Sequence, residues 1–137
     1  MTQDQILLVQ KSWPGISNRL DTIGEQFYEN LFEAAPHLKK LFVTSKELQG
    51  SKFMQLVGLH VTKLHLKDEP DETLASLGKR HLAYGVKDEY FDTFGQTLIK
   101  TLRDEMGSEL WNPELEAAWA EAYRQLSALM QKGMHQE

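Results

Sequence analysis

The sequence contains no cysteine among its 137 residues. This absence excludes disulfide bonds, thiolate metal sites and cysteine nucleophiles, and it fits a cytoplasmic protein without requiring one. No apolar run approaches the roughly 18 residues that a membrane-spanning helix needs. The first residues, MTQDQ, are polar, so no signal peptide is visible. We therefore expect a soluble, cytoplasmic protein with no membrane partner.

Positive charge is also scarce, because 15 lysines and arginines face 20 aspartates and glutamates, a formal net charge of −5. This balance lacks the basic surface that nucleic-acid binding requires, and it lacks a polybasic membrane patch. Hydrophobic residues make up 41% and charged residues 26% of the chain, an ordinary globular composition. The length suffices for one hydrophobic core and is too short for two. We therefore expect residues 1–137 to form a single domain without a nucleic-acid partner.

Recognisable catalytic and phosphate-binding motifs are missing as well. The glycine pairs with phosphate-loop spacing lack the lysine and the serine or threonine that must follow them, and no H-E-x-x-H motif occurs. His60 and His65 are five residues apart, which does not place both on one face of a helix. The sequence alone therefore identifies no catalytic residue, and it leaves open whether the protein is an enzyme.

What the sequence does contain is apolar residues at helical spacing along its whole length. Alternation typical of strands never extends beyond a few residues, so we expect an all-α fold of about seven helices with short connections. A long amphipathic helix is expected to end before Gly107. The expected helix starts are marked by capping or first-turn residues, namely Thr2 with Gln5, Pro36, Thr44 with Glu47, and Asn112 with Pro113.

One expected helix carries an apolar stripe of Leu20, Ile23, Phe27 and Leu31, and it also contains Gly24. A glycine inside a helix costs roughly 1 kcal/mol relative to alanine. A close crossing with another helix is one compensation that would explain this residue.

Another expected helix carries Leu74, Leu77, His81 and Tyr84 on one stripe, so His81 faces the core. A buried imidazole needs a partner for each ring nitrogen, and the carbonyl of Leu77, one turn back, can be one of them. Spacing alone leaves two interpretations open: a core histidine with both nitrogens satisfied, which is the commoner case, or a ligand. The same two interpretations apply to His60.

In their order and spacing, these features resemble the globin family over nearly the whole chain. The stretch FYENLFEAAPHLKKLF is similar to single-domain bacterial haemoglobins of the flavohaemoglobin lineage, LASLGKRHLAYGVK is similar to neuroglobin, and AAWAEAY is similar to both. The resemblance implies a globin fold, packed three-over-three around haem b (iron protoporphyrin IX). Its landmarks are Pro36 opening a short third helix, Phe42 six residues later, and His81 before the long penultimate helix, and it implies that His81 is the proximal iron ligand.

The resemblance also implies the residues on the distal side of the haem. Tyr28 falls where the second helix points into the distal pocket. An ungapped count back from His81 places Gln49 at the distal position usually held by histidine. Lys52 and Phe53 fall at the next two distal sites, where Lys52 could reach the iron or, more commonly, bind a haem propionate.

Further contacts with the haem follow from the same resemblance. Gly24 and Gly50 would let the second helix and the distal helix cross closely. The remaining residues implied to touch the haem are Phe42, stacked on the ring, Arg80, at a propionate, and Leu77, Val86, Phe91, Phe94 and Tyr123, along the proximal side and the edges.

The sequence departs from the flavohaemoglobin pattern behind the proximal histidine. Domains of that type carry a tyrosine and a glutamate there, which make the histidine more anionic. Phe91 and Met134 stand at the matching positions, so we expect His81 to be an ordinary neutral imidazole bonded to a backbone carbonyl. The chain also ends at Glu137 without a flavin or nicotinamide domain, so a self-contained nitric oxide dioxygenase is not expected.

The resemblance implies a protein that binds O2 reversibly and tightly, because Tyr28 and Gln49 can each donate a hydrogen bond to the partly negative ligand. CO and NO would bind at the same position. Three alternatives remain: a nitric oxide dioxygenase working with a separate reductase, a haem-based redox or gas sensor, and a globin-like bundle without haem. We expect a monomer or a weak homodimer.

Overall fold

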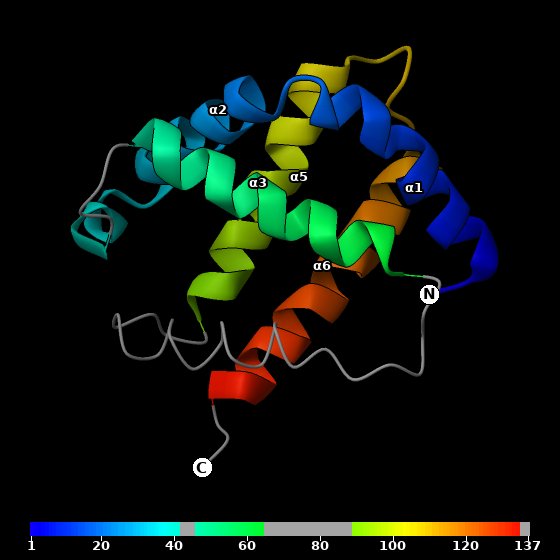
Figure 1. Cartoon of the computed structure of the whole chain (residues 1–137). Helices are drawn as coiled ribbons and strands as arrows, with labels where there is room; N and C mark the ends of the chain where they lie inside the picture. The colour runs from blue at the N-terminus through cyan, green and yellow to red at the C-terminus, as the bar shows by residue number, and fades with distance from the viewer. Residues whose placement is uncertain (42–45, 65–88, 135–137) are drawn as a thin grey trace.

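The structure is a computed structural model that describes residues 1–41, 46–64 and 89–134, with side chains described except at 40–53, 133 and 134. All regular structure in this part of the chain is helical, which confirms the all-α class. None of the described helices is long and apolar enough to span a membrane. The elements in chain order are α1 (Gln3–Ser17), α2 (Leu20–Ala34), the 3-10 helix η1 (Pro36–Leu41), α3 (Lys46–Thr62), α5 (Tyr90–Met106) and α6 (Pro113–Met134) (Figure 1).

Local capping interactions start two of the helices as the sequence predicts. The Oγ1 of Thr2 accepts a hydrogen bond from the backbone N–H of Gln5 at 3.1 Å, and the Oε1 of Gln5 accepts one from the backbone N–H of Thr2 at 3.0 Å. The Oδ1 of Asn112 accepts from the backbone N–H of Leu115 at 2.8 Å. Each cap satisfies an N–H group that the first turn of the helix leaves unpaired.

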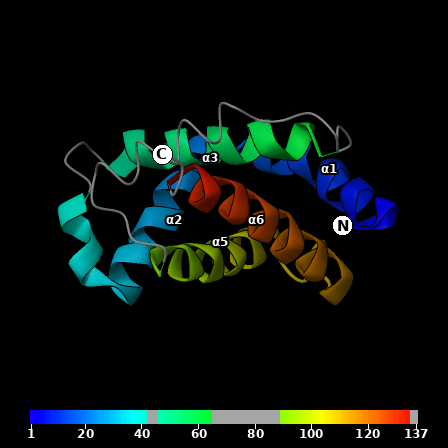
Figure 2. The same ribbon diagram turned by 90° about the horizontal axis from the view of Figure 1, so that it is seen from below.

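Helix α2 buries the predicted apolar stripe, since Ile23, Phe27 and Leu31 are each exposed by 1% or less. Gly24 is buried on the same helix. The most extensive packing between described helices joins α2 to α3, and the two helices lie against each other in both ribbon views (Figure 1, Figure 2). The buried glycine on this packed helix agrees with the predicted close crossing.

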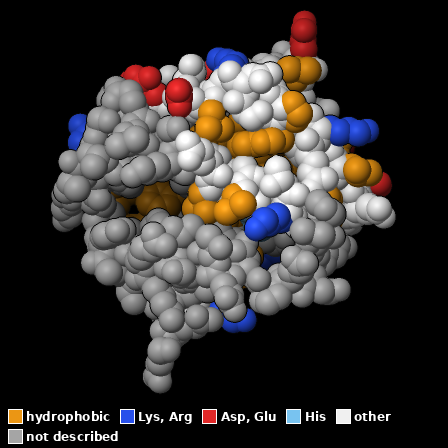
Figure 3. Space-filling model, viewed as in Figure 1, with side chains coloured by type: hydrophobic (Ala, Val, Ile, Leu, Met, Phe, Trp, Pro, Cys, Tyr) orange, Lys and Arg blue, Asp and Glu red, His pale blue; other side chains and the backbone are white. Residues whose placement is uncertain are grey.

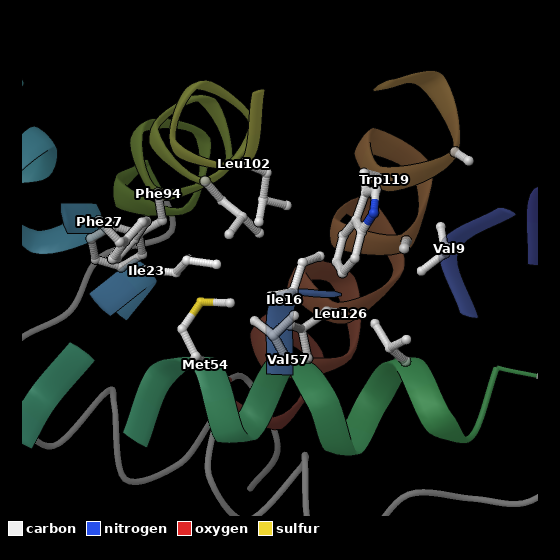
Figure 4. Close-up of a cluster of buried hydrophobic side chains, with 14 of the residues drawn as sticks. Val9, Ile16, Ile23, Phe27, Met54, Val57, Phe94, Leu102, Trp119 and Leu126 are labelled. Atoms are coloured by element: carbon white, nitrogen blue, oxygen red, sulfur yellow. The ribbon is translucent and has the colours of Figure 1, made fainter. Parts of the chain in front are cut away.

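The core lies between α3 on one side and the α5–α6 pair on the other (Figure 2). Side chains from all five described α-helices point into this space, and each large apolar side chain that is fully buried contributes about 1.5–3 kcal/mol. The residues labelled in Figure 4 are Val9, Ile16, Ile23, Phe27, Met54, Val57, Phe94, Leu102, Trp119 and Leu126.

Two further glycines mark close approaches between helices that the sequence did not reveal. A Cβ atom on Gly58 of α3 would overlap the Cζ2 of Trp13 in α1. A Cβ atom on Gly95 of α5 would lie 2.6 Å from the Cε2 of Tyr123 in α6. Both separations are shorter than any van der Waals contact, so these two helix pairs pack as they do because a side chain is missing at each position.

The surface carries a few exposed apolar side chains. Leu7, Leu8, Leu110 and Leu129 are 46%, 36%, 63% and 37% exposed. Figure 3 shows apolar side chains that reach the surface over α1 and α3, interspersed with polar atoms and with lysine or arginine side chains. Isolated leucines of this kind are normal on a globular surface.

Candidate functional site

Tyr28, the predicted distal residue, lies on α2 and is 5% exposed. Its ring meets that of Phe27 edge to face, with centroids 5.0 Å apart and an interplanar angle of 84°. The ring of Phe32 lies 5.7 Å away, at 43°. Burial in these apolar surroundings raises the pKa of the Tyr28 phenol far above its usual value, because the charged phenolate loses its hydration. The phenol therefore keeps its proton and can donate a hydrogen bond.

The other predicted distal residues belong to α3. Gln49, Lys52 and Phe53 lie within this helix, as expected for residues of a distal helix, and α3 is the main packing partner of α2. Their side chains are outside the described residues. The direction of Gln49 toward Tyr28 therefore stays a prediction.

Three predicted pocket residues gather near the start of α5. The rings of Phe91 and Phe94 are 5% and 8% exposed, and their centroids lie 5.9 Å apart at 74°. The hydroxyl of Tyr123, from α6, donates to the backbone carbonyl of Phe91 at 2.7 Å. Figure 4 shows Phe94 pointing toward Phe27 of α2. The structure therefore brings Phe91, Phe94 and Tyr123 into one aromatic cluster next to α2.

The electrostatics of this aromatic cluster resemble those around Tyr28. Burial raises the pKa of the Tyr123 phenol far above its usual value, and the nearby carboxylate of Asp92 adds to the shift. A proton retained on Tyr123 is what its hydrogen bond to the Phe91 carbonyl requires.

The predicted iron ligand lies outside the described residues, and so do four of its predicted neighbours. Within the described part of the chain, no group of three or more histidine, cysteine, aspartate or glutamate residues could hold a metal ion. The assignments that remain predictions for this reason are His81 together with Phe42, Leu77, Arg80 and Val86.

The structure places the side chain of His60, for which the spacing left two interpretations open, in the core. Its side chain is 8% exposed, and its Nε2 lies 3.1 Å from the backbone carbonyl oxygen of Ala122 in α6. This contact supports the interpretation of His60 as a core histidine, because one of its ring nitrogens has a hydrogen-bond partner in α6.

Sequence reasoning missed a chain of side-chain hydrogen bonds between α2 and α5. It starts at Gln26, passes through Asn30 and Thr101, and ends at a carbonyl of α5. The available signal was the spacing of Thr93, Thr97 and Thr101 at intervals of four residues. That spacing lets a threonine hydroxyl bond to the carbonyl one turn back, but it does not say which helix supplies the next partner.

Residues 25–130 match the family model described as Globin. Two plant proteins named anaerobic nitrite reductase are similar to this chain. One, from Gossypium hirsutum, is 29% identical over 148 residues, covering 97% of this chain and 93% of that relative. The other, from Oryza sativa subsp. japonica, is 30% identical over 139 residues, covering 97% and 94%.

Solved structures share the fold at lower sequence identity. An engineered carbene transferase derived from a Rhodothermus marinus protein superposes with a TM-score of 0.86 at 20% identity, covering 98% of this chain and 93% of that one. The flavohemoglobin of Malassezia yamatoensis, with bound FAD and heme, superposes with a TM-score of 0.82 at 22% identity. The match covers 97% of this chain but only 36% of the flavohemoglobin.

Proposed function

We propose, from the premise that the chain belongs to the globin family, that it binds haem b and holds O2 reversibly and tightly, with CO and NO as competing ligands. The observation that carries this proposal is the buried phenol of Tyr28, 5% exposed and surrounded by the rings of Phe27 and Phe32. A buried hydrogen-bond donor beside aromatic rings is suited to a small, partly negative ligand.

The described residues are compatible with the walls of a haem pocket. Aromatic rings from α2 and α5 are buried, and the Tyr123 hydroxyl is satisfied by the Phe91 carbonyl, so this wall presents apolar surface. Haem, when bound, supplies the iron atom at which a diatomic gas coordinates. In the proposal, His81 binds the iron, Phe42, Phe53, Leu77 and Val86 contact the ring, and Lys52 and Arg80 bind the propionates.

The role of Tyr28 in the proposal is to slow ligand release. Its pKa is raised by burial, so the hydroxyl stays protonated and can donate to O2. A hydrogen bond to a charged acceptor is worth about 1.5–3 kcal/mol, which corresponds to a release roughly ten to a hundred times slower. CO is less polar and gains less. Gln49 would be the second donor.

The test is the rate of O2 dissociation from the haem-loaded protein, followed by stopped-flow displacement with CO. Tyr28→Phe removes the hydroxyl and should raise the rate by about ten- to a hundredfold. Tyr90→Phe, at the half-buried start of α5, removes a hydroxyl to which the proposal assigns no contact with the ligand and should leave the rate unchanged. An unchanged rate in Tyr28→Phe, or a purified protein that shows no Soret band after haemin is added, would refute the proposal.

A second candidate is an enzyme of nitrogen oxides working with a separate reductase. The relatives named anaerobic nitrite reductase, at 29% and 30% identity over 97% of this chain, favour it. Oxidation of NO to nitrate by held O2, and reduction of nitrite to NO, each leave the protein oxidised by one electron, so turnover requires a reductant. Stopped-flow mixing with NO or nitrite, followed by addition of cell extract, tests this candidate. It fails if the oxidised product is never reduced again.

A further inference from the structure

A side-chain hydrogen bond joins helices α2 and α5. The Nδ2 of Asn30 donates to the Oγ1 of Thr101 at 2.9 Å, and that hydroxyl donates to the carbonyl of Thr97 at 2.7 Å. Thr101 is 0% exposed and Thr97 is 5% exposed. The acceptor end of the bond therefore lies inside the interface, whereas Asn30 is half-buried.

The direction of this bond is determined by the available protons. A threonine hydroxyl has one hydrogen, and the hydroxyl of Thr101 gives it to the Thr97 carbonyl, so it must accept from Asn30. The Oδ1 of Asn30 accepts from the Nε2 of Gln26 at 3.0 Å, which leaves the Nδ2 of Asn30 facing Thr101. Both ends of the amide are thereby constrained, and a flipped amide would lose both bonds.

Buried apolar side chains form much of the interface between α2 and α5. Ile23 and Phe27 of α2 face Phe94 and Leu102 of α5 in the core (Figure 4). Apolar contacts are not directional and tolerate small rotations, whereas a hydrogen bond weakens steeply with angle and distance. Arg19, just before α2, also binds Glu105 of α5, but its side chain is 48% exposed and this ion pair is screened by solvent.

We propose that Asn30 and Thr101 are positioning residues that set the rotation of α2 and thereby the location of the Tyr28 hydroxyl. The inference rests on the proposed role of Tyr28. Asn30 follows Tyr28 by two residues on the same helix, about 3 Å along its axis. A helix rotation of about 10° moves side-chain atoms at a radius of about 6 Å by about 1 Å. Such a shift is enough to break a hydrogen bond of normal length.

The test compares Thr101→Val with Thr101→Ser in the haem-loaded protein. Valine keeps the shape of threonine but removes the hydroxyl, whereas serine keeps the hydroxyl. Thr101→Val should accelerate O2 dissociation by about 2- to 30-fold and shift the CO stretching frequency, which reports hydrogen-bond donors near the ligand. Thr101→Ser should restore both readouts to values near those of the parent. In a Tyr28→Phe background, Thr101→Val should change neither, because the donor it positions is gone.

The outcomes separate this inference from the proposed function. If Tyr28→Phe alters O2 dissociation but Thr101→Val does not, Tyr28 acts without positioning by Asn30 and Thr101, and the inference is wrong. A Thr101→Val protein with a lower melting temperature but unchanged ligand readouts has lost only a structural bond, which also overturns it. Equal defects in the valine and serine variants would assign the effect to packing. If Tyr28→Phe itself changes nothing, the proposed function fails first.

Discussion

Replacing Gly95 by alanine tests how tightly α5 and α6 pack, and the structure indicates how far the free energy of unfolding should change. The new Cβ would lie 2.6 Å from the Cε2 of Tyr123, whereas ordinary contact begins at 3.4 Å, so the ring must move by about 0.8 Å. The ring is not free to do so. Its hydroxyl donates to the carbonyl of Phe91 at 2.7 Å. Because Phe91 lies on the same helix as Gly95, a shift of the Tyr123 ring away from Gly95 lengthens this hydrogen bond.

The energies of this substitution oppose one another. Alanine gains about 1 kcal/mol of helix propensity over glycine. Overpacking typically costs about 1–3 kcal/mol, and the weakened Tyr123 hydrogen bond costs about 0.5–1.5 kcal/mol more. We therefore expect Gly95→Ala to lower the free energy of unfolding by about 1–3 kcal/mol, measured from the midpoint of urea unfolding.

A matched control exists in the same chain. Gly15 lies inside α1, and a Cβ there would meet no atom within 4 Å. Gly15→Ala should therefore stabilise the protein by about 0.5–1 kcal/mol. Stabilisation of similar size by Gly95→Ala would refute the reasoning. In a Tyr123→Leu background, where the ring is absent, the cost of Gly95→Ala should largely disappear.

Alkaline pH should destabilise the fold, because burial raises the pKa of Tyr28 and Tyr123. Above about pH 10 the unfolded chain releases protons that the native state keeps, so stability falls with rising pH. Each tyrosine contributes a slope of about 1.4 kcal/mol per pH unit, and urea titrations of Tyr28→Phe and Tyr123→Phe should show shallower slopes; a slope equal to the parent's would contradict this. Asn112→Ala should cost about 1 kcal/mol, because the N–H of Leu115 loses its acceptor. Asn112→Asp should retain most of that stability, and an alanine variant as stable as the parent would show that the cap contributes nothing.

The features that could be predicted from the sequence are those determined by neighbouring residues. The caps at Thr2 and Asn112 depend on residues three positions away, and the stripe of α2 depends on a period of one helical turn, so both could be read directly. The burial of Tyr28 agrees with the resemblance to globins. His60 had two open interpretations, because nothing near it in the sequence names Ala122 as its partner.

The features that were missed depend on residues far apart in the chain. Gly58 is needed because of Trp13, and Gly95 because of Tyr123, yet each glycine looks locally like a weak point in a helix. Nothing near Asn30 in the sequence indicates its hydrogen bond either, because its partner Thr101 is 71 positions away. Only the three-dimensional packing of the helices identifies these partners.

Two separate hydrogen bonds connect the candidate site to α5. Asn30 on α2 reaches Thr101, and Tyr123 on α6 reaches the carbonyl of Phe91. Because hydrogen bonds are directional and apolar packing is not, α5 is the element against which both neighbouring helices are oriented. Side chains that are already oriented lose little conformational entropy when a ligand binds. More of the free energy of each contact with the ligand therefore contributes to affinity. The tight O2 binding that we propose, through the Tyr28 hydroxyl, therefore depends on α5, although Tyr28 itself lies on α2.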